Sequence, residues 1–121
     1  FLREAARQRG LAAAEVHAAA LARRFGRVSL RDTRGRWGSC TSAGDLMFSW
    51  RLILAPDDVL DYVVAHEVAH LVEMNHSQAF WAVVERLRPD YGTARDWLRR
   101  HGPGLMAFDF APSAAPAAGA A

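Results

Sequence analysis

The first 25 residues repeat apolar side chains at the spacing of a helix, in which positions three or four apart share one face. The apolar positions that do so here are Leu2, Ala6, Ala13, Val16 and Ala20. Gly10 weakens or splits this helix, and Gly26 stands where a glycine commonly follows a helix end. We therefore predict an N-terminal helix over residues 1–25.

Between residues 28 and 54 the pattern changes to that of short strands. Residues 28–36 predict a strand that runs into a turn at Arg34-Gly35, and residues 36–40 predict a second strand. The polar run 41–45 predicts a turn, and residues 46–54, rich in aromatic and branched side chains, predict a third strand. Three short strands in succession predict a small antiparallel sheet.

A second amphipathic stretch begins at Pro56, a residue tolerated in the first turn of a helix. Its apolar positions are Val59, Leu60, Val63, Val64, Val68 and Leu71. So wide an apolar face predicts a largely buried helix that ends near Asn75. The aspartates near its start, Asp57, Asp58 and Asp61, are expected to be a solvated first turn.

Two further helices are predicted after residue 76. Ser77 is a candidate cap for a helix that Pro89 ends, and a short helix over residues 93–101 is expected to stop at Gly102-Pro103-Gly104. From Ala111 onward only Ala, Pro, Ser and Gly occur, a composition typical of a disordered tail. The whole pattern predicts an α+β fold with an N-terminal helix, a short sheet and C-terminal helices.

Composition narrows the class of protein. The chain has 121 residues, 51% of them hydrophobic and 23% charged, which fits one folded domain. No apolar run approaches the roughly 20 residues that cross a bilayer, so no membrane association is expected. Cys40 is the only cysteine, which excludes an internal disulfide and a cysteine-rich zinc cluster and favours a reducing compartment.

The basic residues are all arginine. Their abundance, together with that of alanine, indicates a coding bias, and the formal net charge is only +2. A nucleic-acid partner therefore stays possible but is supported by no sequence motif.

The predicted second helix carries the motif His66-Glu67-Val68-Ala69-His70. Residues four apart lie one turn apart on the same face, so His66 and His70 can bind one metal ion. Glu67 lies about 100° around the helix from His66, where it can reach a metal-bound water as a general base. This HExxH pattern predicts a Zn2+ site.

A catalytic zinc ion usually has three protein ligands and one open position. The candidates for the third ligand are His76, Glu73 and Glu85. Glu73 lies about 10 Å along the helix axis from His66, too far for one metal, and Glu85 lies on the following helix. His76 is favoured, because a chain that turns back at Asn75 brings it to the metal.

Several motifs in order resemble the YgjP-like metallopeptidases, small zincins related to the SprT-like and WLM proteases. The motifs are residues 36–40 (RWGSC), 50–56 (WRLILAP), 62–70 (YVVAHEVAH), 75–77 (NHS) and 80–81 (FW). The resemblance covers roughly residues 1–105. It implies a zincin-like domain over 1–105 that lacks the N-terminal sheet region usual in the family, followed by an extension over 106–121.

The resemblance also implies an activity and a place of action. It implies zinc held by His66, His70 and His76, with Glu67 as the base in the hydrolysis of peptide or protein substrates. It further implies a bacterial cytoplasmic protein. Tyr91 and Arg36 are candidates, by residue type alone, to stabilise the oxyanion.

Three further expectations concern the surroundings of the site. The strand Leu46–Trp50 is a candidate sheet edge that pairs with a peptide substrate, although a core strand is an equal reading. The tryptophans Trp37, Trp50, Trp81 and Trp97 are expected in the core. Cys40 is expected to be a small buried residue rather than a zinc ligand.

Two other functions are compatible with the pattern. A zinc hydrolase of a non-peptide substrate, such as a nucleotide phosphoanhydride, uses the same water-activating site, but the chain has no glycine-rich phosphate loop. The second is that of a non-enzymatic adaptor stabilised by zinc. Removal of the metal would unfold such a domain. The sequence sets no oligomeric state.

Overall fold

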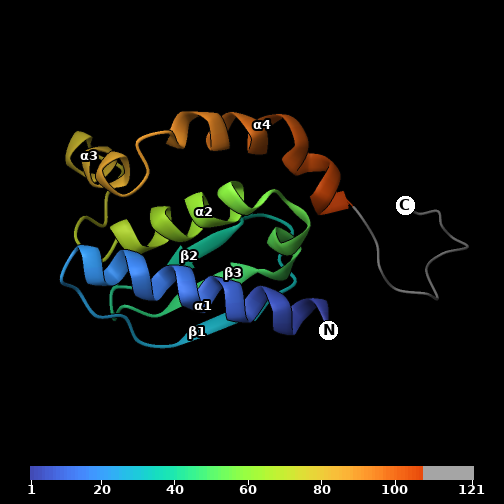
Figure 1. The fold of residues 1–121 in the computed structure, drawn as a ribbon, viewed down its shortest axis with the longest axis horizontal. Coiled ribbons are helices and arrows are strands. Elements are labelled where there is room, and N and C mark those ends of the chain that lie inside the picture. The colour runs from blue at the N-terminus through green and yellow to red at the C-terminus, as the bar shows by residue number, and fades with distance from the viewer. Residues whose placement is uncertain (108–121) are drawn as a thin grey trace, which may run out of the picture.

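The computed structural model describes residues 1–107, and the predicted α+β fold is confirmed. Helices α1 and α2 pack against a three-stranded sheet, while α3 and α4 pack against α2 (Figure 1). The elements are α1 (Leu2–Ala20), β1 (Val28–Arg31), β2 (Gly38–Cys40), β3 (Leu46–Ser49), the 3-10 helix η1 (Trp50–Leu54), α2 (Asp57–Ala69), α3 (Gln78–Leu87) and α4 (Tyr91–Ala107). No helix of this part of the chain is long and apolar enough to cross a membrane.

The sheet is mixed, so the prediction of an antiparallel sheet is wrong for one of its two strand pairs. The strand order is β1-β3-β2, with β2 antiparallel to β3 and β1 parallel to β3. After β1 the chain crosses to the far edge to form β2, and a tight turn at Gly44 (φ +91°) returns it to the middle. Because of this excursion, β3 enters the sheet in the direction of β1.

The third strand is shorter than predicted and is central. It ends at Ser49, whose hydroxyl accepts a hydrogen bond from the Arg51 amide (3.3 Å) and so caps η1. Residues 50–54 are therefore 3-10 helix and not strand. The prediction that Leu46–Trp50 forms a sheet edge is wrong, because β3 is the central strand, between β1 and β2.

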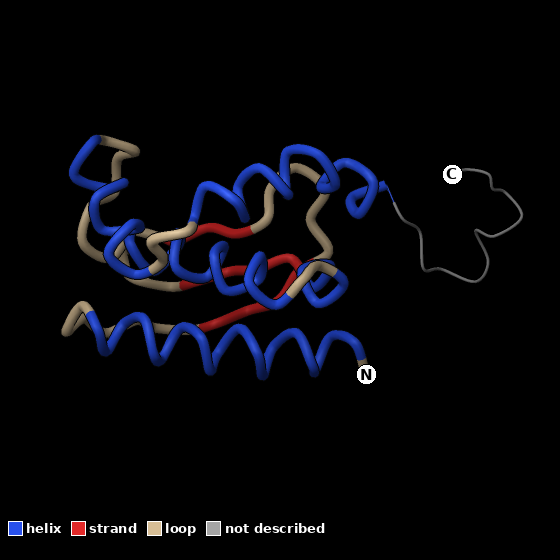
Figure 2. The backbone as a smooth tube through the Cα atoms, turned by 45° about the horizontal axis from the view of Figure 1, so that its top comes forward, coloured by secondary structure: helices blue, strands red, loops and turns tan. Residues whose placement is uncertain are grey.

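Alternation along β3 fixes which face of the sheet is buried. Leu46 and Phe48 are 1% and 2% exposed and face the helices, whereas Met47 is only partly buried. Gly10 lies over Phe48, where an added Cβ would be 3.5 Å from the ring. Gly10 therefore packs within an unbroken α1, and Figure 2 shows this helix running beside the strands.

α1 ends five residues earlier than predicted. Ala22 adopts a left-handed conformation (φ 56°), which stops the helix. Gly26 does not end it, and lies instead against Asp45, where a Cβ would be 2.2 Å from the carboxylate oxygen Oδ1. Close approach of this side chain explains the glycine.

The later helices differ from prediction mainly at their ends. α2 starts after Pro56 as expected but ends at Ala69, with His70 as its C-cap, and not near Asn75. Ser77 caps α3 as predicted, and its hydroxyl accepts a hydrogen bond from the Phe80 amide (3.3 Å). The predicted disordered tail from residue 111 lies outside the described residues.

α4 continues through Gly102-Pro103-Gly104, which were expected to stop it. Arginine side chains bind the carbonyls of its last turn: Arg51 Nη1 donates to Leu105 O (3.0 Å) and Arg34 Nη1 donates to Met106 O (3.1 Å). Gly102 packs on Trp37, where a Cβ would be 3.2 Å from the indole. These contacts offset the hydrogen bond that Pro103 cannot donate.

Candidate metal and catalytic site

Three histidines meet at the C-terminal end of α2. His66 and His70 lie one turn apart, and His76 lies in the loop that leads to α3. One potential ligand atom from each histidine lies within 4.8 Å of the others. The chain turns back between Ala69 and Ser77, which brings His76 beside the pair.

A single buried ring supports all three imidazoles. Phe80, 0% exposed, stacks on His70 with 4.4 Å between ring centroids. It meets His66 and His76 edge to face, with 5.0 Å between ring centroids in each pair. The Ser77 cap sets the first turn of α3 and so fixes the position of Phe80. The cluster is therefore held from α2 and α3 together.

The backbone after α2 orients one of the imidazoles. His70 Nδ1 donates a hydrogen bond to the carbonyl oxygen of Glu73 (3.0 Å), which leaves Nε2 available for a metal. Burial lowers the pKa of His70 although this hydrogen bond opposes the shift. The lowered pKa favours the neutral imidazole, the form that binds metals.

Glu67 lies beside the histidines with its carboxylate buried. The residue is 6% exposed, and Oε2 lies 3.2 Å from Nδ1 of His66. The edge strand β2 packs on it so closely that a Cβ on Gly38 would lie 3.0 Å from Glu67 Cγ and 3.2 Å from Oε2. Gly38 thus leaves the space that the carboxylate occupies.

The residues present fit a zinc ion. Three imidazoles are a common ligand set for catalytic zinc, and they leave a fourth position open. Within residues 1–107, His66, His70 and His76 form the one group of three or more potential ligands that comes this close together. Glu67 is adjacent to that group and is not part of it.

The other candidates lie elsewhere. Glu73 contributes its backbone carbonyl to His70, and Glu85 is exposed on α3, outside the histidine group. The ring of Tyr62 lies between Tyr91 and the site. The ring centroids are 6.4 Å apart for Tyr91 and Tyr62, and 6.0 Å apart for Tyr62 and His66. Arg36 lines a groove on the opposite face of the sheet with Ser39 and Met47.

Two ionisable groups near the site, the phenol of Tyr62 and the thiol of Cys40, have raised pKa values. Burial raises the pKa of Tyr62 to about 12, and burial together with the charges of Glu67 and Asp45 raises the pKa of Cys40 to about 11. Both groups therefore stay protonated at neutral pH. Cys40 is only half-buried, so the expectation of a buried residue is met in part, and the thiol lies outside the histidine group.

A family model described as the YgjP-like metallopeptidase domain matches residues 1–101. The chain belongs to the YgjP-like metallopeptidase family. The fold is similar to the crystal structure of the metallopeptidase zymogen of Pyrococcus abyssi abylysin, with a TM-score of 0.66 and 20% sequence identity. That match covers 77% of this chain and 92% of abylysin. No curated protein sequence matches the chain.

Two features of this YgjP-like site were missed in the sequence. Gly38 and the carbonyl of Glu73 contact Glu67 and His70 only because of the path of the chain in space. A signal for Gly38 existed, since it lies in the RWGSC motif that supports the family resemblance. The carbonyl of Glu73 left no signal, because any residue can supply one.

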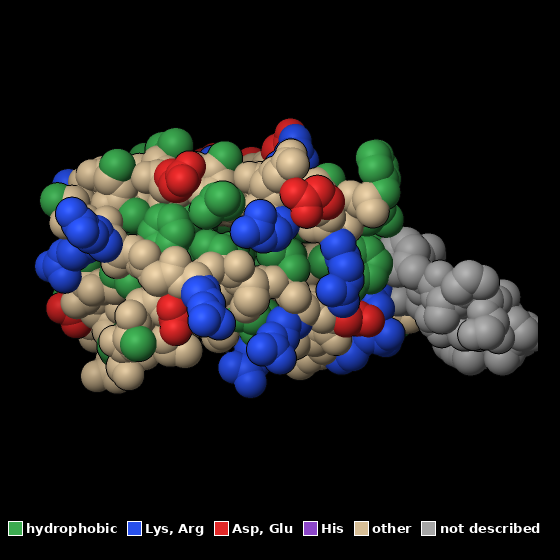
Figure 3. All heavy atoms as spheres, turned by 90° about the horizontal axis from the view of Figure 1, so that it is seen from below, with side chains coloured by type: hydrophobic (Ala, Val, Ile, Leu, Met, Phe, Trp, Pro, Cys, Tyr) green, Lys and Arg blue, Asp and Glu red, His purple; other side chains and the backbone are tan. Residues whose placement is uncertain are grey.

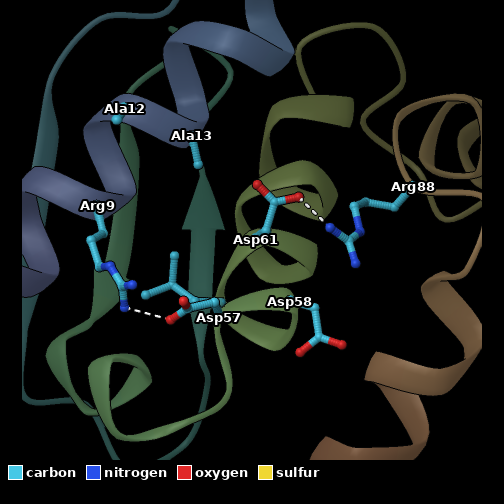
Figure 4. A pocket seen from close by; sticks show the side chains of 8 residues that line it. Arg9, Ala12, Ala13, Asp57, Asp58, Asp61 and Arg88 are labelled. Carbon is cyan, nitrogen blue, oxygen red and sulfur yellow. Dashed lines mark hydrogen bonds and ion pairs between the residues drawn. The ribbon is translucent and has the colours of Figure 1, made fainter.

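A separate cavity of about 490 Å3 lies between α1 and the start of α2 (Figure 4). Four of its five charged residues are paired within the protein: Arg9 with Asp57 at 2.6 Å, and Arg88 with Asp61 at 3.0 Å, whereas Asp58 is exposed. Asp61 also lies 3.0 Å from Nε2 of His17, so it is not the solvated residue that was expected. This cavity contains no part of the histidine group.

Proposed function

We propose that this chain is a zinc-dependent peptidase that uses His66, His70 and His76 as ligands and Glu67 as the general base. The observation that carries the proposal is the convergence of the three imidazoles, within 4.8 Å of one another, beside a buried carboxylate. Zinc bound there would lower the pKa of a coordinated water and polarise the scissile carbonyl. Membership of a metallopeptidase family supports a peptide bond as the target.

Each residue then has a separate role. Glu67 accepts the proton of the attacking water on a carboxylate oxygen and returns it to the leaving amine. The hydrogen bond to Glu73 O keeps His70 in the tautomer that presents Nε2. The Phe80 ring excludes water from behind the imidazoles.

The substrate backbone is proposed to pair with β2, the edge strand beside Glu67. Trp37 and Thr41 flank β2 in the sequence. The carbonyl of Trp37 accepts a hydrogen bond from the amide of Ser49, and the amide of Thr41 donates one to the carbonyl of Asp45, so the backbone groups of Trp37 and Thr41 point toward β3. Alternation in an antiparallel pair directs the backbone groups of Gly38 and Cys40 away from β3. An extended peptide can form hydrogen bonds with them next to the Glu67 carboxylate.

The test is Glu67→Gln, assayed with casein and with nucleotides in parallel. Loss of the base predicts a fall in casein hydrolysis of roughly 10²–10⁴-fold. The zinc content is expected to stay unchanged, because Glu67 is not a ligand. Hydrolysis retained in this variant would reject Glu67 as the base, and cleavage of nucleotides but not casein would reject a peptide substrate.

A further inference from the structure

The charge of the chain is unevenly distributed. Six of the fifteen arginines lie between residues 23 and 36, where Asp32 is the only acidic residue. The rest of the chain has nine arginines and twelve acidic residues, and so is net negative. The small total charge therefore conceals a strongly basic segment, and such asymmetry is typical of a surface that meets an anionic partner.

This segment borders the face of the sheet that points away from the helices. Leu46 and Phe48 face the core, so Met47 between them faces outward. The strand register places Ser29 of β1 and Ser39 of β2 on either side of Met47. A groove of about 470 Å3 opens over this row.

Three arginines line the groove with their guanidinium groups unused. Arg27, Arg31 and Arg36 are exposed, and within residues 1–107 their side chains make no ion pair or hydrogen bond. Nearby Arg34 and Arg51 instead bind Asp32 and the end of α4. Figure 3 views the molecule from below and shows Lys and Arg side chains in blue across this side, several of them close together at its lower edge.

One acidic residue, Asp45, also lines the groove and offsets the charge of only one of the three arginines. Asp45 Oδ1 accepts a hydrogen bond from the backbone amide of Arg27 (2.8 Å), and its own amide donates to the Thr41 hydroxyl (3.0 Å). Its carboxylate thus holds the turn after β2 against the start of β1. The groove keeps a net positive charge, and its lining also includes the hydroxyl groups of Ser29, Ser39, Thr33 and Thr41 and the apolar residues Leu46 and Met47.

We propose that this basic groove (Arg27, Arg31, Arg36 and the hydroxyl groups between them) binds the phosphate backbone of double-stranded nucleic acid without reading its sequence. Arginine, serine and threonine side chains are the usual partners of phosphate oxygens. None of the residues that line the groove is aromatic, so bases are not stacked as in single-strand binding.

The test uses the full 121-residue chain and a fluorescent DNA duplex of about 20 base pairs, with affinity measured by anisotropy over a range of salt concentrations. Each phosphate contact changes the slope of log K against log salt by about −0.9. Arg27→Gln/Arg31→Gln is therefore expected to weaken binding and reduce the slope by about 1.8. Arg36→Gln, outside the strands, is expected to reduce it by about 0.9.

The matched control is Arg3→Gln/Arg7→Gln, which removes the same charge at the same spacing from exposed positions on α1. It is expected to leave the slope unchanged, with circular dichroism confirming that every variant folds. Equal losses in the two double variants would overturn the proposal in favour of general charge attraction. Absence of duplex binding, or equally strong competition by polyglutamate of matched charge, would also overturn it.

Discussion

At the candidate site a glycine faces the proposed base. Gly38 on β2 leaves just enough space for the side chain of Glu67, whose atoms would lie 3.0 and 3.2 Å from an added Cβ. The oxygen of Met47 would lie 3.0 Å from the same Cβ on the other side. A methyl group at this position must therefore displace the carboxylate or the strand.

Gly38→Ala is expected to lower peptide hydrolysis by roughly 10- to 100-fold, because a small misplacement of a catalytic group has a large effect on rate. The zinc content of this variant should match that of the unchanged protein, because the atoms nearest to an added Cβ at Gly38 belong to Glu67 and Met47 and not to a histidine. Gly35→Ala is the control, since nothing lies within 4 Å of a Cβ there. Equal activity of the two variants in a casein assay would refute the packing argument.

At the scale of elements, one aspartate joins three helical segments. Asp61 of α2 accepts a hydrogen bond from Nη1 of Arg88, the residue that ends α3, at 3.0 Å (Figure 4). It also lies 3.0 Å from Nε2 of His17 on α1. Burial alone would raise the pKa of Asp61, but the hydrogen bonds and charges of His17 and Arg88 outweigh it and lower the pKa. The folded state therefore holds the carboxylate ionised more strongly than the unfolded chain does.

A carboxyl group whose pKa is lowered by folding stabilises the protein above its unfolded value of about 3.9 and loses that contribution as the pH falls further. The free energy of unfolding is thus expected to drop below about pH 4. Asp61→Asn should be less stable at pH 7 by about 1–3 kcal/mol, with a weaker acid dependence. Urea unfolding at several pH values measures both effects.

The control for this network is Asp58→Asn on the same helix. Asp58 is exposed and, within the described residues, makes no hydrogen bond or ion pair. As an exposed residue in the first turn of α2, Asp58 is expected to contribute only the modest helix-dipole term of about 0.3–1 kcal/mol, so Asp58→Asn should lower the free energy of unfolding less than Asp61→Asn. An identical acid dependence in Asp61→Asn and Asp58→Asn would show that the Asp61 network does not contribute.

Sequence periodicity predicted the elements better than their ends and pairings. The apolar spacing of α2 located the helix that carries His66 and His70, because burial of one face follows directly from the order of residues. The end of α4 could not be predicted, because Arg51 and Arg34 bind its last carbonyls from distant positions in the chain. The parallel pairing of β1 with β3 likewise depends on the path of the chain between them.

At the scale of the molecule, the layers place two different surfaces on opposite sides of one sheet. α2, which lies against β2 and beneath α3, carries His66 and His70 (Figure 1). The outer face of the sheet carries the basic groove. The sequence predicted His66 and His70 because their spacing along one helix is local. It did not predict the groove, because alternate residues of separate strands form it.

The measurement that tests the central claim most directly is the metal content of the purified chain after zinc loading and dialysis. The three-histidine site predicts one tightly bound zinc per chain, and its loss in His76→Ala. The control His101→Ala, on α4 and outside the histidine group, should keep the ion. Full zinc occupancy in His76→Ala, or no bound zinc in the unchanged chain, would contradict the account.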